Sequence, residues 1–448
     1  MSQQQQETNI DEVTISIFAP FDTFIYLDLN ILASIGLLET QEKVLNTIKA
    51  NKEKNIGMKW TTEESLAFKL SKGVFTPPGE ISSFLNIKLD DIPINEKVGK
   101  FLPNTLIFRN CQVYIHLFGV GSCTVEVNLK HIEGLQILEL DAISETINSL
   151  FKKYFEDKCF YIAKQYKKAI EKAKIDYYAF NFLPTVLTVD KSKHFIPWTH
   201  RVYHIHDSKN QLFSLDNPGV LFSHLVTPSR QFDVKDFSIY DNRYIYFGWG
   251  HSIILTKSDE RSFSYTDRPP SEYIRLVQIS QANWQGINLL TQIMDLAFSN
   301  FVLDYSKLNS SKLKKLIVKL RYCNISIELL LDRFEGLSLT YDTEKRILYN
   351  ELHKRWETQH MIERMKKRLT TAQGILKDLD NRETMRRQQS LNNIVFLFTL
   401  FTLIGTINLL LEISGINIIT GEKLLIILGV TFLTSLIIIF YINFVGRD

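Results

Sequence analysis

The fold is decided by Leu391–Leu411, LNNIVFLFTLFTLIGTINLLL, in which 21 consecutive residues carry no charge. A second uncharged stretch of 22 residues, LLIILGVTFLTSLIIIFYINFV, follows at Leu424–Val445. At 1.5 Å per residue, each is long enough to cross a hydrocarbon core of about 30 Å as a helix. The alternative is a pair of buried helices in a soluble domain, but buried helices of this length usually keep a polar face. The sequence therefore predicts two transmembrane helices.

The charges that flank the two spans predict their orientation. Arg382, Arg386 and Arg387 precede the first span and Arg447 follows the second, whereas the connecting segment 412–423 holds one Lys and two Glu. Lys and Arg are enriched on the cytoplasmic side of membrane spans. The N-terminus is polar and glutamine-rich, without the pattern of a signal peptide. We therefore expect a multi-pass protein of the cell inner (plasma) membrane with both termini in the cytoplasm.

The first span carries a polar stripe. Asn392, Thr399, Thr402 and Thr406 are separated by 7, 3 and 4 residues, which places them on one side of a helix. These hydroxyls and the amide are expected to line a wet pore. The alternative is that each Thr bonds its own helix or packs against a neighbour. Because two spans cannot enclose a pore, conduction would need a homo-oligomer around a symmetry axis.

A long helix is predicted to enter the membrane from the cytoplasm. No proline follows Tyr341, so the helix is expected to run from about Asp342 through Leu411, with Gly374 as its weak point. Its apolar residues step by 3 and 4, the heptad spacing of a seam that faces a partner: Ile362, Met365, Leu369, Ala372, Leu376 and Leu379.

Three acidic residues lie close before the first span. Asp378, Asp380 and Glu383 would be repeated around the axis of an oligomer, where they could sense cations. The alternative is an ordinary solvated, charge-rich helix surface. Both interpretations stay open on the sequence alone.

The order of these parts, with Gly415-Ile416-Asn417 after the first span, resembles the CorA superfamily of divalent-cation channels. That family carries Gly-Met-Asn at this place, so Ile replaces Met here. The resemblance implies a selectivity filter at Gly415, Ile416 and Asn417, a homopentamer, and transport of divalent cations, most of all Mg²⁺. Divergent relatives look like membrane effectors opened by a nucleotide messenger in prokaryotic antiviral, CRISPR-associated systems, which is the alternative function. A membrane-tethered scaffold without conduction is a third.

The N-terminal part predicts a mixed α/β (or α+β) domain. Strands are expected at 13–29, at 194–206 and at 242–257, the last broken by Gly248-Trp249-Gly250. A hairpin is expected at 105–129 around Gly119 and Gly121, and a helix at 142–174. Helices dominate from about residue 271. We therefore expect a cytoplasmic domain at 1–270, a helical region with the stalk at 271–390, and a transmembrane hairpin at 391–448.

Several aromatic and basic residues of this domain could hold a nucleotide by stacking and hydrogen bonding: Trp198, Arg201, Tyr203, His204, His206, Trp249 and His251. The alternative is that Trp198 and Trp249 are core aromatics at the tight turn Gly248-Trp249-Gly250. On a strand, His200, His204 and His206 would share one face, next to Asp207, which makes zinc a further possibility.

Composition excludes other classes. The formal charge is 52 − 49 = +3, so no nucleic-acid polymer is expected as a partner. Four scattered cysteines fit neither a zinc ribbon nor a disulfide scaffold. GxxxxGK[ST], GxGxxG, GxSxG and HExxH are all missing from the sequence, so we expect neither an enzyme nor an organic cofactor. Mg²⁺, transported or regulatory, is the expected ion, and the lipid bilayer and further copies of the chain are the expected partners.

Overall fold

The fold is known from a computed structural model of the full chain. The structure describes the following residues: 12–27, 37–50, 57–62, 83–94, 106–116, 118–130, 137–175, 177–178, 196–209, 211–215, 218–226, 234–257, 270–304, 310–335, 343–414, 421, 429 and 432. They form a mixed α/β part followed by a long C-terminal helix with an apolar end, as the sequence predicts.

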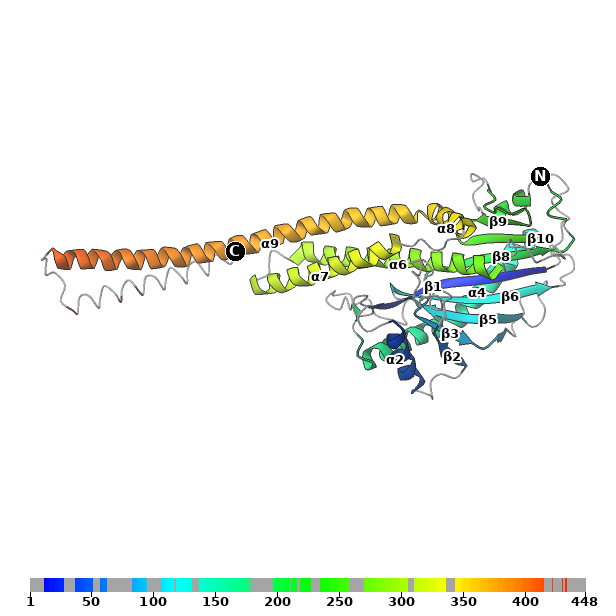
Figure 1. Ribbon diagram of the computed structural model, residues 1–448, viewed down its shortest axis with the longest axis horizontal. Coiled ribbons are helices and arrows are strands. Elements are labelled where there is room, and N and C mark those ends of the chain that lie inside the picture. The colour runs from blue at the N-terminus through cyan, green and yellow to red at the C-terminus, as the bar shows by residue number, and fades with distance from the viewer. Residues whose placement is uncertain are drawn as a thin grey trace, which may run out of the picture. The chain divides into compact units, whose positions relative to one another are not determined.

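A sheet of ten strands is the centre of the N-terminal part. Its main path runs β2-β3-β5-β6-β1-β8-β10-β9, and Figure 1 shows the strands in this order. All pairs on this path are antiparallel except the parallel pair of β8 and β10. The strand bounds are β1 Glu12–Leu27, β2 Met58–Thr61, β3 Leu85–Leu89, β4 Ile92–Ile94, β5 Leu106–Ile115, β6 Phe118–Lys130, β7 Tyr177–Tyr178, β8 His200–Asp207, β9 Arg243–Phe247 and β10 His251–Lys257.

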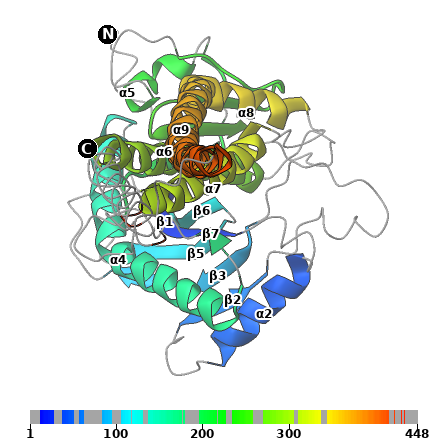
Figure 2. The same ribbon diagram turned by 90° about the vertical axis from the view of Figure 1, so that its left-hand side faces the viewer.

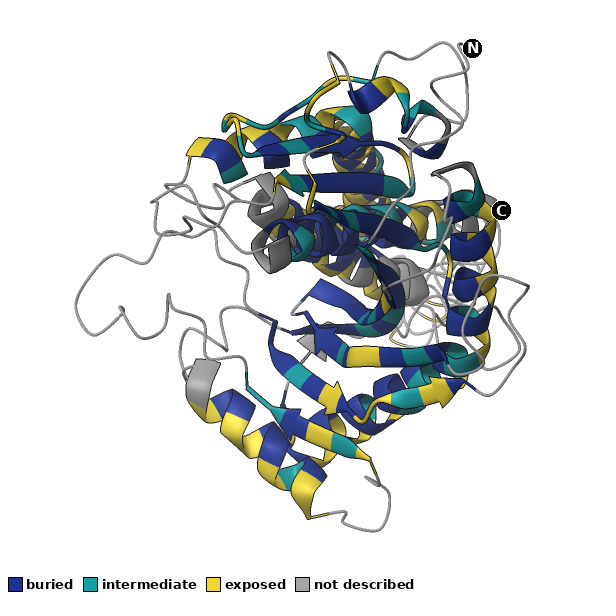
Figure 3. Cartoon of the chain, turned by 90° about the vertical axis from the view of Figure 1, so that its right-hand side faces the viewer, coloured by how far each residue is buried: buried dark blue, intermediate teal, exposed yellow. Residues whose placement is uncertain are grey.

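Strand β1 lies in the middle of the sheet because its sequence suits burial on both faces. The strand reads EVTISIFAPFDTFIYL, and both its odd and its even positions are largely buried. Near-continuous apolar runs of this kind are typical of strands that are covered on both sides. The sheet interior is correspondingly buried in Figure 3.

The hairpin of β5 and β6 forms as predicted, but its two glycines have another role. The turn lies around His116, whose backbone N–H donates to the Val120 carbonyl at 2.9 Å. Gly119 and Gly121 lie inside β6, where an added Cβ would be 2.6 Å from the Tyr26 ring and 2.2 Å from the Phe21 ring. The glycines therefore allow two aromatic rings of β1 to lie on the neighbouring strand.

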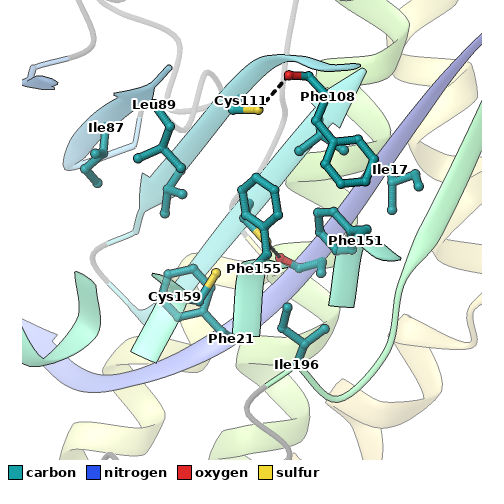
Figure 4. Packing of buried hydrophobic residues seen from close by; sticks show 14 of the residues in the cluster. Ile17, Phe21, Ile87, Leu89, Phe108, Cys111, Phe151, Phe155, Cys159 and Ile196 are labelled. Carbon is teal, nitrogen blue, oxygen red and sulfur yellow. Dashed lines mark hydrogen bonds between the residues drawn. The ribbon is translucent and has the colours of Figure 1, made fainter. Parts of the chain in front are cut away.

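One face of the sheet is covered by α4 (Ile137–Lys172), with α2 (Leu37–Lys49) beside it. Figure 2 shows both helices on this side of the sheet. Phe151 and Phe155 of α4 pack against Phe108 of β5, with ring centroids of Phe108 and Phe155 6.3 Å apart (Figure 4). The predicted helix at 142–174 is thus confirmed, with its start at Ile137, and its buried side chains belong to the same core as those of the sheet.

The other face is covered by α6 (Pro270–Asp304) and α8 (Thr343–Arg355). Tyr273 and Val277 of α6 pack with Leu348 of α8 against Val202 and Ile254 of the sheet. Short elements close the region near β9 and β10: η3 (Pro218–Val220) and α5 (Ser223–Val226). The two faces of β8 and β10 are therefore covered by different helices, α4 on one face and α6 with α8 on the other. Each candidate residue of these strands contacts one set of helices or the other.

The long helix predicted from Asp342 is interrupted, and this part of the prediction was wrong. Helix α8 ends at Arg355, and α9 (Thr358–Ile413) begins after Trp356 and Glu357. Glu357 has φ of 51°, in the left-handed region that a helix cannot contain. Gly374, the predicted weak point, lies inside the continuous helix α9.

The chain divides into two compact units, residues 1–297 with 326–367, and residues 298–325 with 368–448. Within the second unit, Arg321 of α7 (Ser310–Glu335) reaches Asp380 of α9 at 3.4 Å. The predicted heptad residues of α9 are all buried within the single chain. A second copy of the chain is therefore not needed to cover this seam.

Among the described residues, α9 is the one helix that is long and apolar enough, by length and composition, to cross a membrane, and its apolar stretch lies toward its C-terminal end. Almost none of its apolar stretch is buried in the protein. Leu391, Phe398, Leu403 and Leu410 are among its exposed large apolar side chains. Of the predicted second span, Leu424–Val445, the structure describes Gly429 and Phe432, and the rest lies outside the described residues.

Candidate functional site

Strand β8 separates the residues that the sequence grouped into one ligand pocket. Arg201 and Tyr203 point to the face that α4 covers, and His200 and Val202 point to the face of α6 and α8. His251 pairs with Arg201 in register and contacts Tyr203, so it belongs to the α4 side. The seven predicted pocket residues therefore form two separate groups.

The first group centres on the Arg201 guanidinium. Its Nη1 lies 2.9 Å from Ser144 Oγ and 2.8 Å from Glu145 Oε2, both on α4. The hydroxyl group of Tyr203 is also hydrogen-bonded to Ser144 Oγ, at 2.7 Å. His251 Nδ1 donates to the Leu225 carbonyl, which fixes the ring beside Tyr203 at a centroid distance of 6.0 Å. We call Arg201, Ser144, Glu145, Tyr203 and His251 the Arg201 cluster.

Electrostatics keep the rings of this cluster neutral. Burial lowers the pKa of His251, and the nearby positive charge of Arg201 lowers it further. Burial raises the pKa of Tyr203 to about 12. Both rings are therefore uncharged at neutral pH, and the formal charges near them are those of Arg201, Glu145 and Asp141.

The histidines on the other face of β8 are bonded to hydroxyl groups. His200 Nε2 lies 2.8 Å from Ser252 Oγ, and His204 Nε2 lies 3.0 Å from Thr256 Oγ1. His206 Nδ1 is 3.5 Å from the same Thr256 oxygen. Burial lowers the pKa of His204 to about 4, so this ring is neutral.

The zinc interpretation is not supported by this geometry. Asp207, the fourth predicted ligand, accepts hydrogen bonds from the backbone N–H groups of Gln211, Leu212 and Phe213 at 3.0, 2.7 and 3.1 Å. Across the part of the chain that the structure describes, no group of three or more His, Cys, Asp or Glu side chains could hold a metal ion. The shared face of the three histidines is confirmed, but their nitrogen atoms bond hydroxyls.

The predicted tryptophans belong to an aromatic cluster that surrounds the break between α8 and α9. Trp198 contacts Trp284 of α6 and Trp356, with ring centroids 5.3 and 5.8 Å away. Trp249 also contacts Trp284, at 6.1 Å, and is 54% exposed. Trp198 thus packs as the core alternative expected, whereas Trp249 is a surface residue at the turn.

Hydrogen bonds tie this break to the turn between β9 and β10. Arg355 Nη1 donates to the Phe247 carbonyl at 2.7 Å, and Trp356 Nε1 donates to the Gly248 carbonyl at 3.3 Å. Trp284 Nε1 donates to the Trp356 carbonyl at 3.1 Å. We call Arg355, Trp356 and Glu357 the α8–α9 joint. The joint fixes the first residues of α9 to the sheet.

The predicted pore stripe lies on α9, and its four side chains are exposed. The hydroxyl groups of Thr399, Thr402 and Thr406 each donate to the carbonyl four residues earlier, at 2.9, 2.8 and 2.8 Å. This is the local bonding that the alternative interpretation expected. It uses the hydroxyl proton and leaves the oxygen lone pairs able to accept.

The three acidic residues before the first span are in different surroundings. Asp378 and Asp380 are exposed, and Asp380 contacts Arg321. Glu383 has a largely buried side chain that pairs with Arg387 one turn later. Gly415, Ile416 and Asn417, the predicted selectivity residues, lie outside the described residues.

Sequence reasoning missed the partners that complete both groups. Ser144 and Glu145 precede Arg201 by more than fifty residues, and no local pattern links them. Trp356 could have been suspected, because it is an isolated tryptophan in a strongly charged helix surface. Its role depends on a turn 108 residues away, which only the tertiary structure reveals.

Comparisons with known proteins do not establish a family. No protein-family model and no curated protein matches the sequence. Among solved structures, the chain is similar to the CorA magnesium transporter from Methanocaldococcus jannaschii, with 12% sequence identity over 55% of this chain and 90% of that chain. The TM-score is 0.23, a value at which the likeness carries no argument about fold or function.

Proposed function

We propose that the chain is an oligomeric membrane channel or transporter for divalent cations, first of all Mg²⁺, and that the sheet domain gates it through α9. The observation that carries the proposal is the continuity of α9. This helix of 56 residues begins at the joint held by the sheet and ends in an exposed apolar stretch. At 1.5 Å per residue it is about 84 Å long, so one continuous helix runs from the domain to the proposed membrane span.

The threonine stripe suits a hydrated cation. The outer surface of a hydrated Mg²⁺ consists of water hydrogens, and Mg²⁺ gives up its water reluctantly. Threonine hydroxyls whose protons are already donated to Val395, Phe398 and Thr402 can act only as acceptors. Acceptors of this kind would bind the hydration shell without removing it.

Several parts of the proposal rest on the sequence. The second span, the pentamer, the filter at Gly415–Asn417 and the cytoplasmic termini come from charge pattern and resemblance. A cation sensor at Asp378, Asp380 and Glu383 would need acidic groups from neighbouring copies, since the described residues of one chain form no metal-binding group. The chain's own chemistry would be transport rather than catalysis.

Liposome flux tests the proposal. The full chain is reconstituted with a Mg²⁺-sensitive dye inside, and the initial rate of Mg²⁺ entry is compared for the unchanged protein, Thr402→Val and Leu403→Val. Thr402→Val removes an acceptor of the stripe and is expected to lower the rate at least tenfold, a change of about 1.4 kcal/mol. Leu403→Val changes the adjacent exposed apolar residue and is expected to leave the rate unchanged.

The same liposomes separate the alternatives. Absence of Mg²⁺ entry from vesicles that contain inserted, folded protein would exclude the transporter. Silence that ends when a nucleotide is added on the domain side would replace it by the nucleotide-gated effector. Equal rates for the two variants would remove the stripe from the pore.

A further inference from the structure

An arginine without a counter-charge lies just before the apolar stretch of α9. Arg386 is exposed and precedes Leu391 by five residues, about 7.5 Å by the helical rise. Its neighbour Arg387 is paired with Glu383. Among the residues that the structure describes, none forms an ion pair or a hydrogen bond with the Arg386 side chain. A guanidinium that is open to solvent therefore lies close to the proposed membrane surface.

Two amide side chains continue the same side of α9 into the apolar stretch. Gln389 and Asn393 follow Arg386 by 3 and 7 residues, which is the spacing of residues on one face of a helix. Gln389 is exposed and Asn393 is half-buried, and neither side chain is hydrogen-bonded to a described residue. We call Arg386, Gln389 and Asn393 the Arg386 stripe. Its guanidinium and its two amide groups are all able to donate hydrogen bonds.

The Arg386 stripe and the threonine stripe lie on different sides of α9. At about 100° per residue, Arg386 is about 140° around the helix from Thr399, and Asn393 is about 120° from it. In the proposed channel the threonines line the pore, where an arginine would repel an entering cation. The helical geometry turns Arg386 away from this pore. The Arg386 stripe is therefore placed for the outer surface of the channel, which faces lipid.

We propose that the Arg386 stripe binds the phosphate of an anionic lipid on the domain side of the membrane. This inference rests on the proposed function, because it needs the membrane span of α9. The planar fork of the guanidinium suits two oxygens of one phosphate. An arginine close to the end of a span can also extend its charge to the level of the headgroups. The amides of Gln389 and Asn393 lie one and two turns further toward the bilayer, where they can donate to ester oxygens.

The charges around the stripe favour a lipid with a net negative charge. Three acidic groups precede the stripe on α9: Asp378, Asp380 and Glu383. Glu383 is paired with Arg387, and Asp380 contacts Arg321. Asp378 is eight residues from Arg386, about 12 Å by the helical rise. One basic residue near the membrane surface is expected to favour an anionic lipid over a zwitterionic lipid by about fivefold.

The test uses the delipidated full chain in detergent micelles, and native mass spectrometry measures the affinity for the first bound lipid. Phosphatidylglycerol and phosphatidylcholine are the probes, because both contain a phosphate but differ in net charge. Glycerol 3-phosphate, which is soluble in water, distinguishes a free phosphate ester from a lipid. Three proteins are compared: the unchanged chain, Arg386→Gln and Arg364→Gln. Arg364 is the matched control, an exposed arginine 22 residues earlier on α9, about 33 Å from Arg386 by the helical rise.

The unchanged chain and Arg364→Gln are expected to bind phosphatidylglycerol about fivefold more tightly than phosphatidylcholine. Arg386→Gln is expected to bind the two lipids with equal affinity. Three results would overturn the proposal: no preference in the unchanged chain, the same preference in Arg386→Gln as in Arg364→Gln, or displacement of phosphatidylglycerol by glycerol 3-phosphate. No ion gradient is involved, so failure here and failure of the proposed transport are distinguishable.

Discussion

Asp22 is a residue whose environment makes stability depend on pH. Burial raises the pKa of this carboxyl from 3.8 to about 6, while the hydrogen bond from Gln285 Nε2, at 3.0 Å, acts in the opposite direction. The folded state thus binds a proton more tightly than the unfolded state. This contribution is fully present below pH 3.8 and is lost as the pH rises through 6.

Asp22→Asn should remove this pH dependence. The amide oxygen can still accept from Gln285, but no charge is buried at high pH. At pH 7 to 8 the variant is expected to be more stable than the unchanged chain by about 1–3 kcal/mol, and at pH 4 the difference should vanish. Thermal unfolding in detergent at both pH values measures the difference. A constant gap between the two proteins across this range would contradict it.

Glu344 is a buried charge that connects three elements. Tyr273 of α6 donates to Glu344 Oε2 at 2.6 Å, and Arg243 of β9 lies 3.9 Å from Oε1. Glu344→Ala would leave the Arg243 guanidinium, 3% exposed, without its carboxylate. We expect a loss of about 3–5 kcal/mol in the free energy of unfolding. Glu363→Ala, at an exposed position of α9, should change it by no more than about 0.5 kcal/mol.

At the scale of elements, the α8–α9 joint holds the backbone of Glu357 in a strained conformation, and substitutions can measure its cost in stability. Glu357 adopts φ of 51°, which costs a residue with a Cβ about 1 kcal/mol and costs glycine nothing. Glu357→Gly is therefore expected to raise the stability slightly. Glu363→Gly, inside the helix, should lower it by about 1 kcal/mol. If both substitutions destabilise the protein equally, the joint is a continuous helix in solution.

The sequence predicts the strands at the centre of the sheet, because burial on both faces leaves a local signature, but it does not predict the short strands β2, β3, β4 and β7. The apolar run of β1 and the alternation of His200, His204 and His206 on β8 could be found by inspection. The joint could not, since neither proline nor glycine marks residues 355–358, and the break is held by carbonyl groups of a distant turn. The partners of Arg201 were hidden for the same reason, because Ser144 belongs to a separate helix.

For the whole molecule, the exposed apolar end of α9 decides where the protein resides. Phe398 and Leu403 are 67% and 60% exposed, and both lie near the middle of the uncharged stretch. If this stretch lies in lipid, Phe398→Arg with Leu403→Arg would place two charges near the bilayer centre, at about 2.5–3.5 kcal/mol each on the insertion scale. We expect the double variant to be lost from the carbonate-resistant membrane fraction.

Met385→Arg is the control, because Met385 is exposed but lies before the uncharged stretch. This variant should stay in the membrane fraction with the unchanged chain, since an arginine near the interface can reach the headgroups. Equal membrane retention of both variants would show that this end of α9 is not a membrane span, and the proposed transport would then lose its physical basis.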